Sequence, residues 1–132
     1  MRDDPFTPLM QPVLARDREA VEKLLDQGAD PNEHDTDQRW TPLHLAARDN
    51  DAELVKLLLD HGAEVDAVDM FGDTPLWRAT FEARDDMRAI RILLDHGADP
   101  DRANDSGNSP RYLARMMGRD DLLELFSPGD RR

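Results

Sequence analysis

Apolar residues recur with a helical period at four places along the chain. The clearest case is 54–58, where Leu54, Val55 and Leu57 are followed by Leu58, at positions i, i+1, i+3 and i+4. That spacing places them on one wide face of a helix. Segments 20–24, 89–93 and 122–126 repeat the pattern, with Lys23 as a polar exception. The pattern predicts a helix over about 52–61 and three equivalents of it.

A second helix is predicted before each of these stripes. Thr-Pro or Ser-Pro pairs begin at Thr7, Thr41, Thr74 and Ser109, in steps of 34, 33 and 35 residues. A Thr or Ser hydroxyl can cap a helix, and Pro is tolerated at its first position because its missing N–H would be unpaired there. The pair at Thr41 predicts a helix over about 42–50. Gly28, Gly62 and Gly97 follow the stripes and are suited to ending the second helices.

Thr41-Pro42-Leu43-His44-Leu45-Ala46 matches the Thr-Pro-Leu-His-x-Ala motif, and the steps are close to a 33-residue period. The chain therefore resembles the ankyrin repeat family over roughly residues 5–126. The resemblance implies an all-α fold: an ankyrin repeat solenoid of about four helix-turn-helix repeats joined by β-turn fingers. Residues 1–132 would form a single domain with repeats at about 5–36, 37–69, 70–104 and 105–127. We expect residues 1–4 to be frayed and the tail 128–132 to be disordered.

Five departures from the family pattern are visible, one of which is that Trp77 and Arg78 replace the usual His and Leu in repeat three. Pro12 stands where an ankyrin helix has Ala, so we expect the first helix to begin near Pro12 itself. Arg39 occupies the usual glycine place in the first finger, which also has one extra residue. The link over 81–87 is longer by two residues. Polar residues replace apolar ones in repeat four, as suits a capping repeat.

Composition and charge exclude several classes of function. The net charge is −12, which disfavours nucleic acid as a partner and favours a basic protein. There is no cysteine, so thiolate chemistry and disulfides are excluded. No apolar run is long enough to span a membrane and no secretory leader precedes Pro5, so we expect a cytoplasmic protein.

Catalytic and metal sites are not indicated either. His44 belongs to the family motif, whose implied role for it is a structural hydrogen bond, and the equivalent positions of His61 and His96 follow from the repeat. No pair of histidines has zinc-helix spacing, and no phosphate loop or nucleophile grouping is present. We therefore predict no catalytic residues, no metal, no cofactor and no enzyme activity.

The family resemblance implies a binding surface on the concave face, which is made of finger tips and the exposed side of the first helices. Aromatic and Met side chains, which anchor interfaces, are frequent there, although they could instead cover contacts between the fingers. The predicted partner-binding residues are Asp37, Trp40, Arg48, Asp49, Met70, Phe71, Asp73, Trp77, Phe81, Glu82, Asp105, Asn108 and Met116.

The connectors 30–39, 64–73 and 99–108 hold much of the negative charge, part of it being family framework. Acidic fingers around aromatic side chains favour a basic, partly apolar protein partner. The chain resembles small, acidic ankyrin proteins of bacteria, some of which are immunity proteins. The specific hypothesis is therefore that this protein inhibits a cognate toxin enzyme. The alternative is a general adaptor or regulatory scaffold. In both cases we expect a monomer when the protein is free.

Overall fold

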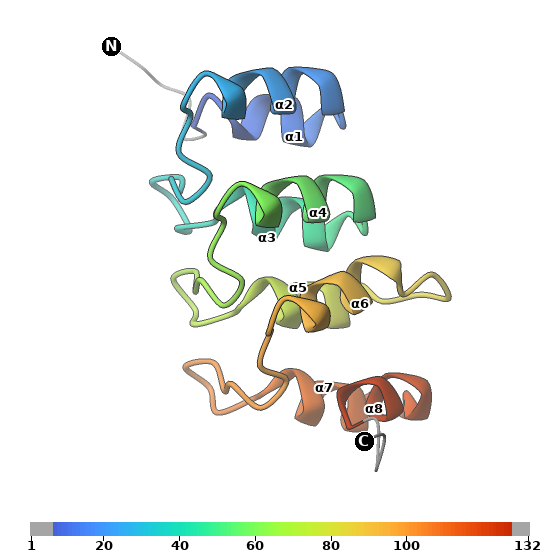
Figure 1. Cartoon of the computed structure of the whole chain (residues 1–132). Helices are drawn as coiled ribbons and strands as arrows, with labels where there is room; N and C mark the ends of the chain where they lie inside the picture. Colours follow the sequence, from blue (N-terminus) through green and yellow to red (C-terminus); the bar gives the residue numbers. More distant parts are fainter. Residues whose placement is uncertain (1–6, 128–132) are drawn as a thin grey trace.

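The computed structural model describes residues 7–127, so the expectations for residues 1–4 and 128–132 lie outside the described part. Within it, eight helices form four antiparallel pairs that stack along one direction (Figure 1). The helices are α1 (Met10–Leu14), α2 (Arg18–Asp26), α3 (Pro42–Arg48), α4 (Ala52–Asp60), α5 (Pro75–Phe81), α6 (Arg88–Asp95), α7 (Pro110–Met116) and α8 (Asp120–Phe126). No strand occurs in residues 7–127, and the all-α solenoid is confirmed.

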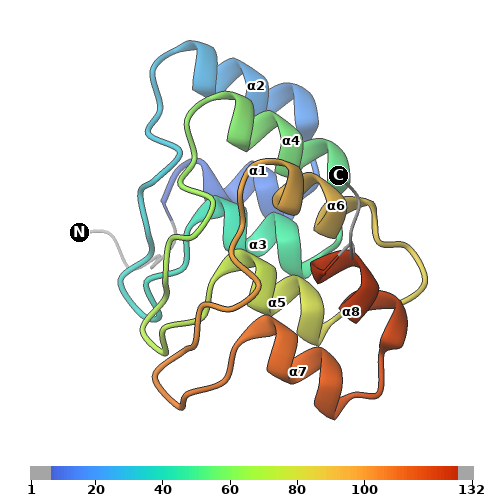
Figure 2. The ribbon, with the colours of Figure 1, turned by 60° about the horizontal axis from the view of Figure 1, so that its bottom comes forward.

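The helices form two layers (Figure 2). The first helices of the pairs, α1, α3, α5 and α7, lie side by side as the inner layer, with the fingers projecting from one end of it. Helices α2, α4 and α6 form the outer layer, and α8 packs against α7. Leu43, Leu58, Leu76 and Leu93 are fully buried between the layers. Each pair buries its apolar face against the next, as a solenoid requires.

Three of the four predicted caps are present, whereas the one predicted at Thr7 is not: α1 has Leu9 at its N-cap and no side-chain cap, and Thr7 Oγ1 makes no hydrogen bond within residues 7–127. The hydroxyls of Thr41, Thr74 and Ser109 each accept a hydrogen bond from the backbone N–H three residues on. Pro follows as the first residue of each of these helices. On the outer layer, the carboxylates of Asp17 and Asp51 cap α2 and α4 in the same way. The inner helices therefore begin in register, which aligns the concave side of successive repeats.

The expected start of the first helix at Pro12 is wrong. Helix α1 begins at Met10, two residues earlier, and Pro12 is its third residue. The N–H groups of the first turn have no partner inside a helix, so the missing N–H of Pro12 costs no bond there. Helix α1 spans only 5 residues.

Each finger is closed by one side chain. The Oδ1 atoms of Asp35, Asp69 and Asn104 each accept two backbone N–H groups from their own finger tip. Arg39 has φ 61°, close to the φ 79° of Gly72 in the second finger. Arg39 therefore occupies the position that glycine holds in the second finger. Its left-handed backbone conformation is unfavourable for a residue with a side chain.

The lengthened link between α5 and α6 is held by its neighbours on both sides. It spans residues 82–87, whereas residues 49–51 join α3 to α4. The amide of Asn50 donates to the carbonyl of Asp86 at 3.0 Å. From the residue before α8, the guanidinium of Arg119 donates to the carbonyls of Ala83 and Arg84, both at 2.9 Å. These contacts fix the end of the concave side next to Phe81.

Candidate protein-binding surface

The large exposed apolar side chains are confined to one side of the molecule. Among residues 7–127 they belong to the second finger and its approach, to α5, and to α7 with its C-cap. They are Val68, Met70, Phe71, Phe81, Tyr112, Met116 and Met117. Within the described part of the chain, none lies on the outer helices. An apolar set confined to one face is typical of an interaction surface.

Arg78 contacts two carboxylates of the second finger and two tryptophan rings. It stands on α5 where the equivalent inner-helix positions hold Leu45 and Leu113. Its Nη2 lies 3.1 Å from the Oδ2 atoms of both Asp69 and Asp73, in the second finger. All three side chains are largely buried. A buried charge needs such partners, so the pair of carboxylates accounts for an arginine at a leucine position.

Two tryptophan rings lie close to this guanidinium. The Cζ atom of Arg78 lies 4.9 Å from the ring centroid of Trp40 and 5.5 Å from that of Trp77. Arg48 contacts Trp40 as well, at 5.3 Å. Trp77 in turn stacks on Phe81, with centroids 5.5 Å apart and planes inclined by 11°. We call these five side chains the aromatic–arginine row. Trp, Arg and Phe are the types that dominate binding energy at interfaces.

The aromatic–arginine row also holds most of the unpartnered buried polar atoms. In residues 7–127 these atoms are Thr7 Oγ1, Trp40 Nε1, Trp77 Nε1 and Arg78 Nε. Three of the four therefore belong to a single cluster. Each such atom costs about 1–3 kcal/mol, and natural proteins concentrate costs of this kind at functional sites. The cluster is therefore a better candidate for function than for stability.

Not every predicted residue faces outward. The Asp73 side chain is buried, where it accepts from the amide of Asn104 at 2.8 Å and pairs with Arg78. Burial raises the pKa of the Asp73 carboxyl, an effect that Asn104 and Arg78 only partly offset. Trp40 is half-buried and packs on the core. Asp73 and Trp40 thus support the surface from below, and Trp40→Ala would disturb the fold as well as the site.

The acidic connectors are also partly internal. Asp35 and Asp69 are buried finger-closing residues, and Asp101 pairs with Arg111 at 2.7 Å. Among residues 7–127, no ion pair engages Asp37 or Asp105, which are exposed. The negative charge available to a partner is smaller than the composition indicates.

The other predicted residues are distributed along the inner layer. Met116 and Glu82 are exposed at the ends of α7 and α5, and Met70 and Phe71 at the tip of the second finger. Asp49 pairs with Arg48 at 3.1 Å and is half-buried, as is Asn108.

Arg78 and Tyr112 depart from the family pattern in the sequence but were not among the predicted binding residues. For Arg78 a signal was available, because an arginine at a position held by Leu45 in the preceding repeat requires a buried counter-charge. Tyr112, at the position of the motif histidine, is exposed on α7.

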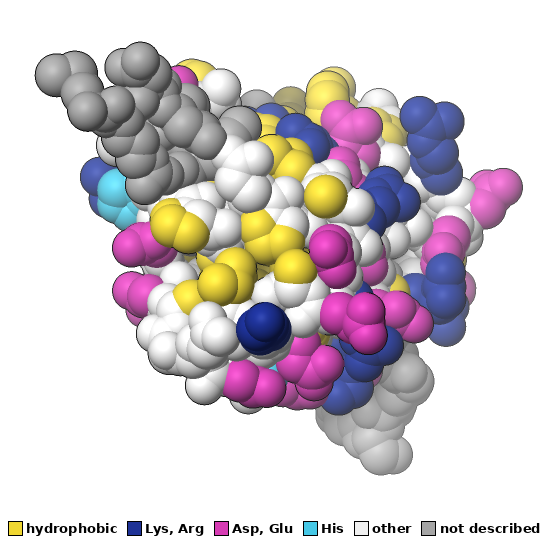
Figure 3. All heavy atoms as spheres, turned by 90° about the horizontal axis from the view of Figure 1, so that it is seen from above, with side chains coloured by type: hydrophobic (Ala, Val, Ile, Leu, Met, Phe, Trp, Pro, Cys, Tyr) yellow, Lys and Arg dark blue, Asp and Glu magenta, His cyan; other side chains and the backbone are white. Residues whose placement is uncertain are grey.

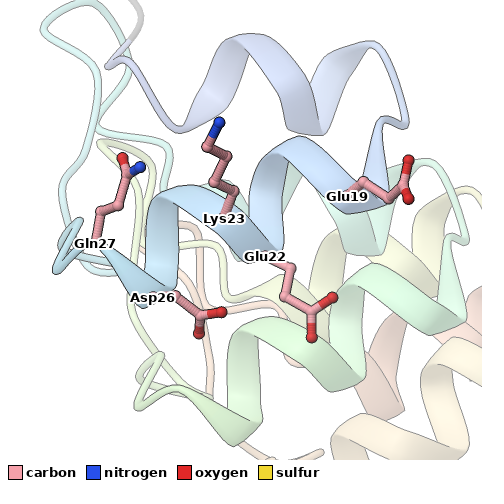
Figure 4. A pocket seen from close by; sticks show the side chains of 5 residues that line it. All are labelled: Glu19, Glu22, Lys23, Asp26 and Gln27. Carbon is pink, nitrogen blue, oxygen red and sulfur yellow. The ribbon is translucent and has the colours of Figure 1, made fainter.

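Two other surfaces of residues 7–127 do not bring aromatic, arginine and exposed apolar side chains together in this way. A shallow hollow beside α2 is lined by Glu19, Glu22, Lys23, Asp26 and Gln27 (Figure 4). Glu22 and Asp26 point to one side of α2 and Lys23 to the other, so they do not gather around a common point. On the end face formed by the first repeat, apolar side chains lie at the centre and acidic ones toward the margin (Figure 3).

The histidines are used by the fold. The buried His44 accepts from the N–H of Thr41 at its Nδ1, and its Nε2 donates to the carbonyl of Asp73 at 2.8 Å. His61 and His96 each bond a carbonyl four residues earlier in their own helices. Residues 7–127 contain no group of three His, Asp or Glu side chains that could hold a metal ion.

The structure is that of a helical repeat protein, with stacked helix pairs and capped inner helices. Its exposed apolar side chains, on the second finger and the inner helices, are typical of a protein-binding surface. The family model for ankyrin repeats, in three copies, matches residues 9–104. The chain belongs to the ankyrin repeat family, whose members generally mediate protein–protein interaction and are not enzymes. No curated protein matches the chain. Across residues 7–127, every helix is too short or too polar to cross a membrane.

Proposed function

We propose that this chain is a four-repeat, bacterial-type ankyrin protein that binds a basic protein partner through its concave face. The pair α7–α8 lies beyond the matched residues 9–104 and is, in this proposal, the fourth repeat. The observation that carries the proposal is the confinement of the exposed apolar side chains to the second finger and the inner helices. Because the protein carries a net charge of −12, a basic partner would be drawn to it.

The specific function that we propose is immunity: a cytoplasmic inhibitor that neutralises a cognate toxin enzyme. An acidic surface with an apolar centre suits a toxin whose own substrate is anionic, because the inhibitor then presents the charge that the substrate would present. Nucleic acid itself is repelled by the same charge. The protein is a monomer until it meets its partner.

A general adaptor is the alternative, and one observation favours it. Three of the exposed apolar residues are methionines: Met70, Met116 and Met117. Methionine side chains are flexible and polarizable, and surfaces that contain them can adapt to several partners. Affinity separates the two functions, since an inhibitor requires a Kd of about 1 nM or below, whereas adaptors are often micromolar.

Capture from the native lysate at physiological salt, followed by mass spectrometry, tests the proposal. We expect one basic protein with an enzymatic domain at equal stoichiometry. The double variant Phe81→Ala/Met116→Ala should weaken its binding at least tenfold, because truncating one anchor residue commonly costs more than 1.4 kcal/mol. Glu22→Ala, on the outer face of α2, is the control. Normal binding by the double variant would refute the concave-face assignment, and a micromolar Kd would refute immunity.

A further inference from the structure

A hollow of about 350 Å³ lies next to the aromatic–arginine row, where the inner helices end. Three successive repeats contribute to its lining, which consists of Arg16, Arg48, Asp49, Asn50, Glu82 and Arg84. Arg48 is also a member of the row, and Glu82 directly follows the exposed Phe81. We call it the arginine hollow. A partner that covers Phe81 would therefore reach it.

The charge of the arginine hollow is opposite to that of the whole protein. Its lining holds three arginines and two carboxylates, which leaves one positive charge, whereas the chain has a net charge of −12. Exposed charges farther apart than about 8 Å are largely screened at physiological ionic strength. The nearby arginines therefore outweigh the distant acidic residues, and the hollow favours an anion although the rest of the protein repels one.

Most N–H donors of these three guanidiniums are unused within residues 7–127. Arg48 uses its Nε to donate to the Asp49 carboxylate, and Arg16 uses its Nη2 to donate to the Asp49 carbonyl, both at 3.1 Å. No hydrogen bond or ion pair engages the Arg84 side chain in the described part of the chain. A guanidinium has five N–H donors in a planar fork that fits both oxygens of a carboxylate.

The helix ends beside the hollow do not account for its arginines. A helix C-terminus carries partial negative charge, which a cation can offset within the last turn. The last carbonyls of α3, however, already accept backbone N–H groups from the residues after the helix, at 3.0 and 3.1 Å, and α1 ends in the same way. Arg84 lies beyond the last turn of α5, which ends at Phe81. Helix capping therefore gives no reason for the unpaired guanidinium of Arg84.

We propose that the arginine hollow binds the carboxylate of an aspartate or glutamate side chain of the protein partner. A carboxylate is a monoanion and matches the single positive charge of the lining, whereas a phosphate group, with a charge of about −1.5 to −2, exceeds it. Within a partner that is basic as a whole, this acidic side chain fixes the orientation of docking, because juxtaposed like charges are costly. The inference rests on the proposed function, since it names one group by which that partner is recognised.

Three blocked tripeptides test the proposal without the cognate partner. They are acetyl-Gly-Glu-Gly-amide, the neutral acetyl-Gly-Gln-Gly-amide and the phosphoserine equivalent. Each is titrated into the ¹⁵N-labelled protein, and Kd is taken from the backbone N–H signals of Asn50, Glu82 and Arg84. We expect a saturable shift with the Glu peptide, none with the Gln peptide, and no tighter binding by the phosphoserine peptide. Equal responses to the Glu and Gln peptides, or a lower Kd for phosphoserine, would overturn the proposal.

Two variants should change binding of the Glu peptide in opposite directions. Arg84→Gln should weaken it about two- to fivefold, the range for one exposed ion pair. Glu82→Gln should strengthen it by a similar factor, because it removes a carboxylate that competes for the same arginines. Arg102→Gln and Glu22→Gln are the matched controls, since they change the net charge equally at exposed positions outside the hollow.

If each variant gave the same Kd as its control, only the overall charge would matter and the proposal would fail. Weaker binding by Glu82→Gln would contradict it as well. Because the assay uses no cognate partner, such a failure leaves the proposed function to its own test.

Discussion

At the scale of single residues, close contacts between neighbouring fingers determine which side chains are tolerated. Gly72 has φ 79°, and a Cβ there would lie 2.6 Å from Asp105 Oδ1 and 2.8 Å from Asp105 N. The same Asp105 N–H donates to the carbonyl of Phe71 at 3.0 Å, so the third finger cannot move away without losing a bond. Gly107 has a similar φ of 83°, but a Cβ there would meet nothing within 4 Å.

We therefore expect Gly72→Ala to destabilise the protein by about 2–4 kcal/mol and Gly107→Ala by about 1 kcal/mol. Both substitutions incur the strain of a left-handed backbone, and only the first adds a clash with another backbone segment. Urea unfolding followed by circular dichroism measures both. Equal losses for the two variants would mean that the fingers adjust independently of one another.

His44 makes stability depend on pH. Burial lowers the pKa of His44, with Arg78 acting in the same direction and the carbonyl of Asp73 and the carboxylates of Asp69 and Asp35 opposing it. Below its ordinary value of about 6.5, the unfolded chain binds a proton that the folded chain does not. This histidine therefore adds no pH dependence above that value and reduces stability as the pH falls beneath it, by up to about 1.4 kcal/mol per pH unit.

The expected result is a free energy of unfolding that falls from pH 7 to pH 5.5 in the wild type, and falls less in His44→Gln. His34→Gln is the control, because it removes a histidine while leaving His44 in place. Urea unfolding at several pH values gives the slopes. If His44→Gln retained the full slope, another group would be responsible.

At the scale of elements, the link 82–87 is longer than its counterparts but is tied to both neighbouring repeats. Arg119 supplies two hydrogen bonds to its carbonyls from the start of α8, and Asn50 supplies one to Asp86. Close to its end, Asp86 accepts from the side chain and the N–H of Arg88, and this lowers the pKa of Asp86 to about 2. The link therefore has a defined shape beside the Phe81 ring.

Arg119→Ala should loosen this link and speed tryptic cleavage after Arg84. Loss of hydrogen bonds worth about 1 kcal/mol raises the open population about fivefold, and proteolysis follows that population. Arg115→Ala is the matched control, since it also removes one tryptic site but takes no bond from the link. Limited digestion followed by mass spectrometry gives the rates. Identical rates for the two variants would mean that Asn50 alone holds the link.

At the scale of the whole molecule, each repeat pair covers the apolar face of the one before it. Leu76 and Leu93 of the third pair are fully buried, and the fourth pair contributes Ala114, Leu122 and Phe126 to the same core. A solenoid of this kind is stabilised mainly by contacts between neighbouring units. Its stability therefore depends on how many pairs it retains.

A chain ending at residue 104 should lose the cap of the third pair, together with Tyr112 and Met116. We expect a melting temperature at least 10 °C lower, or aggregation, because an apolar face becomes exposed to water. Differential scanning calorimetry against the full chain measures this. An unchanged melting temperature would mean that the first three pairs form an independently stable core.

The sequence by itself determined the helices and their order. Helical stripes, Thr-Pro caps and glycine stops are local signals, and they recur with a period that only a stack of equivalent units explains. They sufficed to predict the inner and outer helices, and the repeat register placed Arg39 at the usual glycine position, although its backbone conformation was seen only in the structure. Pro12 misled the prediction, because a proline in the first helical turn is tolerated as well as one at its first residue.

Only the tertiary structure decided which side chains are presented to a partner. The sequence placed Asp73 and Trp40 with Phe81 and Met116 on one binding face. Neighbouring repeats bury Asp73, half-bury Trp40 and leave Phe81 and Met116 exposed, and burial depends on segments distant in sequence. The same holds for Arg78, whose counter-charges come from another segment and whose two ring contacts come from two successive repeats. Periodicity predicts positions within a repeat, whereas the contacts between repeats determine what each position can do.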